Sequence, residues 1–288
     1  MKIRSMLLWG ICLLDISALA GKQLVCNDEE ALAYCASHNN AYISILYPRK
    51  QHNKAAGIRT IFKEFGSIIY EKNIVLFDHG PLNLVRIAYQ TQSWIGDYSN
   101  NFAHARLSVK RRFRVVNKDG SYTVKVVLFL CTNLERVRQC KKKLRALIGQ
   151  GSHAIHINDT HEETMTLAQT VFNNNSVMFL NCIDASTYKD IDAYINALKQ
   201  FLAEHHYDPE HVCVVGDFVK TMFGQGAPQQ LMFITHDDIQ TTDSRTLCCL
   251  NHDVAYQNQA LRDAHIFDPT HYFYYNNIKF SMLPNKGR

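Results

Sequence analysis

The sequence predicts an α/β (or α+β) protein built from two mixed domains. Three observations support this fold class. The chain has 288 residues, 47% of them are hydrophobic, and short apolar runs alternate with segments of helical periodicity from residue 41 onward. This hydrophobic content excludes a disordered or low-complexity chain. A chain of about 300 residues can bury roughly 75% of its unfolded surface, and strands interspersed with helices are typical of mixed folds.

Short runs rich in β-branched and aromatic residues predict the strands. In chain order they lie at 41–47, 74–77, 113–116, 122–130, 154–157, 177–180, 211–215, 231–234 and 272–275. The turn signal Asp119-Gly120 lies between the third and fourth of these runs. Two strands joined by such a turn are expected to pair as a hairpin.

Helices are predicted where apolar residues recur three or four positions apart. They lie at 81–89, 134–148, 160–172, 191–202 and 217–223. Pro81 suits the first turn of its helix, and Asn133 is expected to cap the next one. Thr160-x-x-Glu163 is a capping box, in which the hydroxyl and the carboxylate satisfy backbone donors reciprocally.

The first twenty residues differ in kind from the rest. Lys2 and Arg4 precede an apolar run at 6–14, and the segment ends Ala18-Leu19-Ala20. This order is typical of a secretory signal peptide, although Asp15 also fits an amphipathic or buried N-terminal helix. We therefore expect a signal peptide at 1–20 and a secreted or periplasmic protein with no transmembrane segment after its removal. Without cleavage the protein would be cytoplasmic.

The net charge of +5 conceals a strongly basic block. Residues 106–145 hold 13 basic and 2 acidic residues (+11), whereas residues 151–288 hold 8 basic and 16 acidic residues (−8). A basic block attracts anions, nucleic acid among them. No nucleic-acid-binding motif accompanies it, however, and much of the charge falls on the solvent face of one predicted helix. We expect a small phosphorylated or acidic ligand rather than nucleic acid.

Residues 153–163 carry three histidines and three carboxylates. Such side chains serve as general acids and bases or as metal ligands. We take His156, Asp159 and Glu163 as candidate catalytic residues, on the hypothesis that they converge on one cavity. The alternative is a capped helix with incidental histidines, because the capping box accounts for Glu163 without a ligand.

Basic residues near this segment are candidate ligand contacts. Lys143, Arg145 and His153 could hold a phosphate or a carboxylate. No spacing in the segment matches a specific metal motif. The 9 cysteines include no Cys-x-x-Cys pair, which disfavours a zinc site built on thiolates. We therefore expect no bound metal and no cofactor.

Residues 212–234 read VCVVGDFVKTMFGQGAPQQLMFI, a strand, a Gly-x turn, a helix, a Gly-rich connection and a second strand. This layout resembles the core of the minimal nucleotidyltransferase superfamily, the DNA polymerase beta-like group. In that pattern a Gly-Ser turn holds phosphates and Asp-x-Asp on the next strand holds magnesium. Residues 143–181 and 268–280 look like a bacterial and viral group of proteins that carries this core. The resemblance implies an N-terminal α/β domain at 21–185 and a nucleotidyltransferase-like domain at 186–288.

The resemblance also implies which residues bind the ligand. Gly216 and Asp217 stand at the phosphate-binding turn, with Asp217 in place of serine, while Gln230 and Met232 stand where the metal carboxylates belong. An amide is a poor ligand for magnesium and a thioether is too soft. Asp237 and Asp238 could replace the pair only through a register shift.

These departures imply a catalytically degenerate, nucleotidyltransferase-like protein. Its ligand would carry a phosphate or carboxylate, as a nucleotide or sugar-nucleotide does. One alternative is an active Mg-dependent nucleotidyl- or phosphoryl-transferase. The other is a secreted interaction protein with no small-molecule ligand. The sequence leaves the oligomeric state open.

Overall fold

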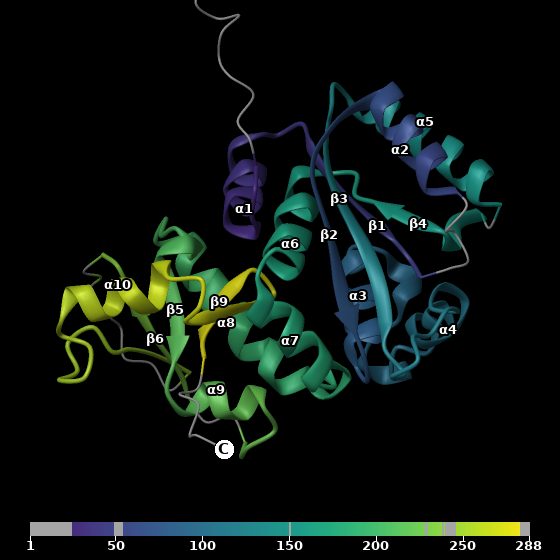
Figure 1. Ribbon diagram of the computed structural model, residues 1–288. Helices are drawn as coiled ribbons and strands as arrows, with labels where there is room; N and C mark the ends of the chain where they lie inside the picture. The colour runs from purple at the N-terminus through teal and green to yellow at the C-terminus, as the bar shows by residue number, and fades with distance from the viewer. Residues whose placement is uncertain are drawn as a thin grey trace, which may run out of the picture.

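The computed structural model describes residues 25–48, 54–149, 151–227, 230–237, 239 and 246–282. Within these ranges the chain forms an α/β fold with two separate sheets (Figure 1). The predicted signal peptide at 1–20 lies outside the described residues, and so does Asp238. In the part that the structure describes, no helix combines the length and the apolar character needed to cross a membrane.

The first sheet is antiparallel and has the strand order β2-β3-β1-β4. Its strands are β1 (Ala41–Leu46), β2 (Gly66–Leu76), β3 (Tyr122–Cys131) and β4 (Ile155–Ile157). Helix α2 (Ala55–Phe65) connects β1 to β2, and α5 (Leu134–Ile148) connects β3 to β4. Apart from two helices between β2 and β3, at 80–88 and 103–112, this βαββαβ order is the ferredoxin-like arrangement. Strand β4 forms one edge of the sheet and is only 3 residues long.

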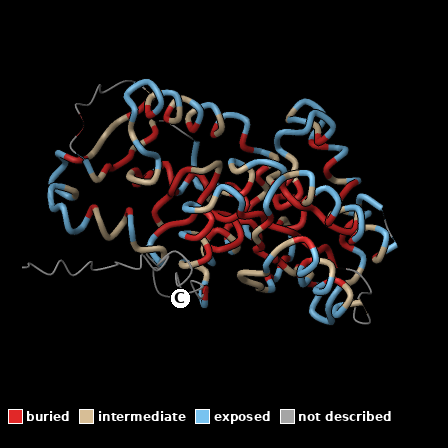
Figure 2. The backbone as a smooth tube through the Cα atoms, turned by 90° about the horizontal axis from the view of Figure 1, so that it is seen from above, coloured by how far each residue is buried: buried red, intermediate tan, exposed pale blue. Residues whose placement is uncertain are grey.

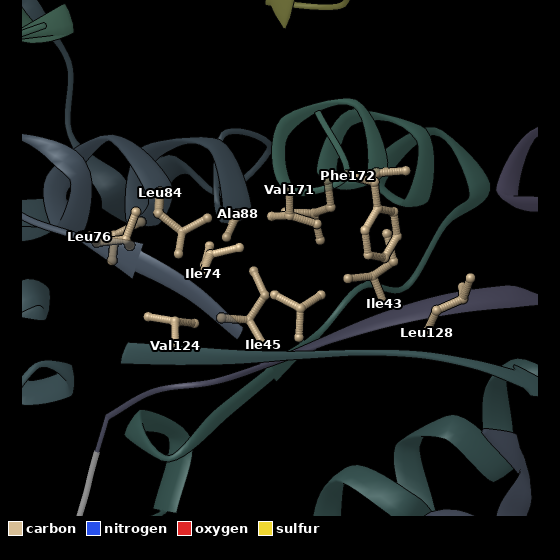
Figure 3. Packing of buried hydrophobic residues seen from close by; sticks show 14 of the residues in the cluster. Ile43, Ile45, Ile74, Leu76, Leu84, Ala88, Val124, Leu128, Val171 and Phe172 are labelled. Carbon is tan, nitrogen blue, oxygen red and sulfur yellow. The ribbon is translucent and has the colours of Figure 1, made fainter. Parts of the chain in front are cut away.

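Each face of this sheet packs against helices, because alternate residues of a strand point to opposite sides. On one face Tyr42 and Leu46 of β1 join a core with α2 and α5. On the other face Ile43 and Ile45 join a second core. The helices of that second layer are α1 (Asp28–Ser37), α3 (Gly80–Ala88), α4 (Ala103–Arg112) and α6 (His161–Val171). Figure 3 shows side chains of β1 and β2 pointing toward α3 and the end of α6.

The second sheet is mixed and has the order β7-β6-β5-β9-β8. Its strands are β5 (Val212–Val215), β6 (Leu231–Thr235), β7 (Leu247–Cys249), β8 (Tyr272–Tyr275) and β9 (Ile278–Ser281). One face packs against α7 (Asn174–Cys182), α8 (Lys189–Glu204) and α9 (Asp217–Met222), and the other against α10 (Gln259–Phe267). Figure 2 shows the buried segments gathered in the interior of both halves.

Helix α7 joins the two halves and corrects one prediction. Residues 177–180 were expected to form a strand, but they lie inside α7. Asn173 caps this helix by accepting a hydrogen bond from the backbone N–H of Ser176 at 2.8 Å. The ring of Phe179 stacks on that of Phe273 in β8, with ring centroids 4.3 Å apart. The apolar run is therefore buried by tertiary packing of a capped helix rather than by strand pairing.

The predicted hairpin of 113–116 with 122–130 is also wrong. Strand β3 pairs with β1 and β2, which lie far from it in sequence. The backbone N–H groups of Arg114 and Val115 instead donate to the carbonyl of Pro48, at 3.4 and 3.3 Å. Strand β2 begins at Gly66, earlier than the predicted 74–77. The other predicted strands and helices lie within two residues of their expected ends.

Asn158 links the edge of the first sheet to α6. Its side chain is fully buried. Its Oδ1 accepts from the backbone N–H of Ile43 at 2.7 Å, and its Nδ2 donates to the hydroxyl of Thr164 at 2.6 Å. This side chain therefore satisfies a backbone donor of β1 and fixes the start of α6.

We predict that Asn158→Ala lowers the free energy of unfolding by about 2 kcal/mol, because it leaves buried polar groups without partners. The neighbouring substitution Asp159→Ala removes only a partly exposed ion pair and should cost less than about 1 kcal/mol. Urea denaturation of both variants measures the difference. Equal costs for the two variants would contradict the structural role assigned to Asn158.

Candidate functional site

A pocket of about 430 Å³ lies between one face of α4, the last turn of α5, the segment that follows α3 and the turn before β4. Its aromatic lining includes Tyr89 and Trp94, and its basic lining consists of His104, Arg111, Arg112, Arg145 and His153. None of the described residues that line it is acidic. We call these seven residues and the space between them the basic pocket.

Arg112 lies at the base of the basic pocket and is only 3% exposed. One of its Nη groups donates to the hydroxyl of Tyr89 at 3.0 Å, and the other donates to Ser108. Its guanidinium carbon lies 4.7 Å from the ring centroid of Tyr89 and 5.9 Å from that of Trp94. Among the residues that the structure describes, no carboxylate forms an ion pair with Arg112. The positive charge is thus held by neutral and aromatic groups alone.

Two of the predicted ligand contacts belong to this pocket. Arg145 comes from the last turn of α5, and its buried Nε has no hydrogen-bond partner. His153 ends the short 3₁₀ segment Gly151–His153 that precedes β4. The structure thus places both next to Arg112, although 33 and 41 positions separate them from it in sequence.

Lys143 lies elsewhere, although it is only two positions from Arg145. Its Nζ forms an ion pair with Glu64 at 2.5 Å and lies 5.1 Å from the ring centroid of Phe65. Residues two apart on a helix do not share a face. The structure therefore turns Lys143 toward α2 and away from the basic pocket.

The residues of α4 that line the basic pocket were not predicted from the sequence. Ser108, Arg111 and Arg112 follow His104 by four, seven and eight positions, so all four residues share one helical face. That spacing could have indicated a common site. The basic block was instead interpreted as a solvated helix face, which is wrong for Arg112 because this residue is buried. Positive side chains in the last turn of a helix also complement its dipole, so α4 and α5 tolerate arginines at these ends.

His156 lies behind Tyr89, in the middle of β4. It is 8% exposed, and its imidazole meets the ring of Tyr89 edge to face with centroids 4.6 Å apart. Burial, together with the positive charges of Lys141, Arg112 and Arg145, lowers the pKa of His156 to about 3. Its Nε2 is buried and has no hydrogen-bond partner. The imidazole is therefore neutral at physiological pH.

Asp159 and Glu163 have different surroundings from His156. Asp159 is exposed and forms an ion pair with Lys141 at 3.0 Å. Glu163 accepts from the backbone N–H of Asp159 at 2.8 Å and from the hydroxyl of Thr91 at 3.0 Å. The hydroxyl of Thr160 accepts from the backbone N–H of Glu163, as the capping box predicts. The carboxylate of Glu163 thus stabilises the start of α6, that of Asp159 pairs with α5, and the histidine is buried behind the basic pocket. None of the three is among the described residues that line this pocket.

The turn after β5 packs closely against β6. Gly216 has a φ of +72°, and a Cβ placed on it would lie 3.1 Å from Cε of Met232. Asp217 is exposed and forms an ion pair with Lys220 at 2.5 Å. Met232, which stands where the resemblance implies a metal carboxylate, therefore packs against this turn.

Asp237 does not reach this turn. It follows β6 at the end where Val212 pairs with Thr235, whereas Val215 pairs with Met232 beside Gly216. Five residues of extended chain span about 16 Å, so a one- or two-residue register shift would not bring Asp237 to Gly216. Asp237 lies 3.4 Å from His211 instead. In the described ranges of the chain, no group of three or more His, Cys, Asp or Glu residues could hold a metal ion.

Comparisons with known proteins do not indicate a function for this chain. No protein-family model matches the chain, and neither a curated protein nor a solved structure matches it. The resemblance to nucleotidyltransferases therefore stays a prediction from the sequence.

The buried His156 generates a pH prediction. The folded protein keeps this imidazole neutral down to about pH 3, whereas the unfolded chain binds the proton below about pH 6.5. Protons therefore favour unfolding, and stability should fall as the pH drops from 6.5 toward 4, by at most about 1.4 kcal/mol per pH unit from this group. Urea denaturation at pH 7, 6, 5 and 4 should show a shallower decline in His156→Gln than in the unmodified protein. Parallel declines would contradict the assignment.

Proposed function

We propose that this protein binds a small phosphate-bearing ligand, of the nucleotide or sugar-nucleotide class, in the basic pocket. The observation that carries the proposal is Arg112, a buried guanidinium that lines the pocket and forms no ion pair with a carboxylate of the described residues. Burying an unpaired charge is costly. A bound anion would offset that cost, so the buried arginine favours a negatively charged ligand.

The chemistry of the lining supports a phosphate in particular. Arg112 and Arg145 present planar guanidinium groups, which bind phosphate oxygens in a bidentate manner. Arg111 adds positive charge toward the mouth, since it is exposed. A pocket of about 430 Å³ lies within the usual range for small-molecule sites.

The aromatic lining supports a ligand with a planar group. Trp94 is 39% exposed at the edge of the pocket, and its ring lies 5.1 Å from that of Tyr89. Bases stack readily on such rings. A phosphate on the arginines with a base against Trp94 describes a nucleotide. The depth of Arg112 favours this small ligand over a nucleic-acid strand lying across the surface.

The second half of the chain fits a nucleotidyltransferase-like core without catalytic carboxylates. Support comes from Met232, which packs over Gly216, and from Asp217, which places a negative charge at the turn. We propose that this half contributes no magnesium-dependent step, and that magnesium is not a cofactor of the protein. An active nucleotidyltransferase would require carboxylates where Gln230 and Met232 stand.

We predict that the protein binds adenosine 5′-monophosphate and that Arg145→Met weakens this binding about tenfold to a hundredfold, the range for losing a charged hydrogen bond. Isothermal titration calorimetry measures the affinity, and Lys143→Met provides a matched control from the same helix. Equal losses in the two variants would contradict the assignment of the pocket. Failure of the unmodified protein to bind either the nucleotide or inorganic phosphate would favour the interaction protein without a small-molecule ligand.

One observation favours phosphoryl transfer as a second candidate function. The unpartnered Nε2 of His156 belongs to a neutral imidazole beside Arg112 and Arg145. A neutral imidazole can act as a base or as a nucleophile toward phosphorus, and the arginines would stabilise the charge that develops. The ring of Tyr89 packs edge to face against this imidazole, so we expect it to move before a phosphoryl group reaches the nitrogen.

If this second function holds, incubation with γ-³²P-labelled ATP should leave an acid-labile phosphate on the protein. His156→Gln should abolish the label, whereas Glu163→Gln should retain it because Glu163 serves the helix start. Labelling that persists in His156→Gln, or unmodified protein that never acquires label, would exclude His156 as the acceptor.

A further inference from the structure

A second cavity, of about 240 Å³, lies at the seam between the two halves of the molecule. From the first half, α3 and the segment containing the 3₁₀ turns Ser93–Ile95 and Tyr98–Asn100 contribute to its lining. From the second half, α7, the start of α8 and the turn between β8 and β9 complete it. It shares no lining residue with the basic pocket. We call it the seam cavity.

Arg86 supplies a cation to the seam cavity. Its guanidinium carbon lies 3.9 Å from the ring centroid of Phe102, and an Nη group reaches the hydroxyl of Tyr98 at 3.4 Å. Its Nε is buried and has no hydrogen-bond partner. In the described part of the chain, no carboxylate forms an ion pair with it. Arg86 therefore has donor groups available for an anionic ligand.

Asn83 supplies an unused acceptor one helical turn away from Arg86. It is 3% exposed, and its Nδ2 donates to the carbonyls of Leu180 and Ile183, at 2.7 and 2.5 Å. Its Oδ1 is buried without a hydrogen-bond partner. Residues three apart on a helix lie on one face. An unpaired buried oxygen is costly, so this acceptor points to a ligand with a donor group.

Asp192 places a negative charge on the opposite wall. Its carboxylate accepts from the hydroxyl of Tyr275 at 3.0 Å, from the amide of Asn276 at 3.1 Å and from the hydroxyl of Tyr98. Burial, together with the hydrogen bond to this carboxylate, raises the pKa of Tyr98, so the phenol keeps its proton. The hydroxyl of Tyr98 thus connects Arg86 to Asp192 and holds the cationic and anionic walls in fixed positions.

The backbone conformation around the seam cavity supports its assignment as a ligand site. Phe102 has a φ of +50°, a conformation that is costly for a residue with a Cβ. This conformation belongs to the residue whose ring faces Arg86. Asn276, on the other wall, has a φ of +49°, but it lies with Asn277 in the two-residue turn between β8 and β9, where positive φ is usual. Strained backbone at ligand sites is commonly part of the arrangement that positions side chains.

We propose that the seam cavity binds a free apolar α-amino acid of about the size of leucine. The carboxylate would bind Arg86, and the ammonium would donate to Oδ1 of Asn83 on the side nearer to Asp192. The apolar side chain would pack against Ile87, Ile95 and Phe179. An amino acid fits better than a plain anion, because the described lining residues include one cation, Arg86, and the two carboxylates of Asp97 and Asp192. A cavity of about 150 Å³ is known to hold benzene, so 240 Å³ accommodates a leucine-sized ligand.

The test measures thermal unfolding of the full chain with three probes of equal bulk. L-leucine carries both charged groups, L-leucinamide lacks the carboxylate, and 4-methylpentanoate lacks the ammonium. At about ten times its Kd, L-leucine should raise Tm by roughly 2–4 °C, and the other two probes should raise it by less than a third of that shift. No shift with L-leucine up to solubility, or an equal shift with either analogue, would overturn the proposal.

Two arginine variants locate the site. Arg86→Met keeps an unbranched side chain over Phe102 and should weaken L-leucine binding at least tenfold, as measured by calorimetry. Arg138→Met removes an exposed arginine of α5 and should leave the binding unchanged. Equal affinity in Arg86→Met would overturn the assignment even if L-leucine binds.

Discussion

The first sheet is covered by helices on both faces, and this constraint determines where a site can form. Side chains from the two helical layers are separated by the sheet except at its edges. Strand β4 is so short that the layer containing α4 and the layer containing α5 meet just beyond it. Arg112 from one layer and Arg145 from the other meet there. The basic pocket is thus a consequence of a three-residue edge strand between two helix ends.

The distribution of charge in the basic pocket follows from the burial of its side chains. Two arginines and a lysine act on His156, and burial removes the solvent that would stabilise its charged form. The imidazole of His156 therefore stays neutral, and the positive charge of the basic pocket lies on the guanidinium groups of its arginines. Aromatic rings then hold Arg112 in place, because Tyr89 contacts both this arginine and His156. The pocket therefore attracts anions without a carboxylate among its described lining residues that would compete with them.

Local signals predicted the elements well where a few neighbouring residues determine the structure. Asn133 and Thr160 cap their helices as expected, accepting from Arg136 and Glu163. The prediction of secondary structure failed where contacts between residues far apart in the sequence determine the structure. Residues 177–180 are equally apolar in a strand or in a buried helix, and only packing against β8 distinguishes the two. Arg145 and His153 line one pocket, but nothing local indicates that Arg112 joins them from α4, or that Lys143 turns away.

Helix α3 connects the two cavities physically. It presents Asn83 and Arg86 to the seam cavity, and the residue that caps its C-terminal end, Tyr89, lines the basic pocket. A rigid helix transmits a displacement along its length, and Tyr89 is the ring that covers His156. If both proposals hold, the two ligands would contact neighbouring parts of this one short helix. Any coupling between them would be reciprocal, because a ligand that stabilises one position of α3 favours every other ligand that requires the same position.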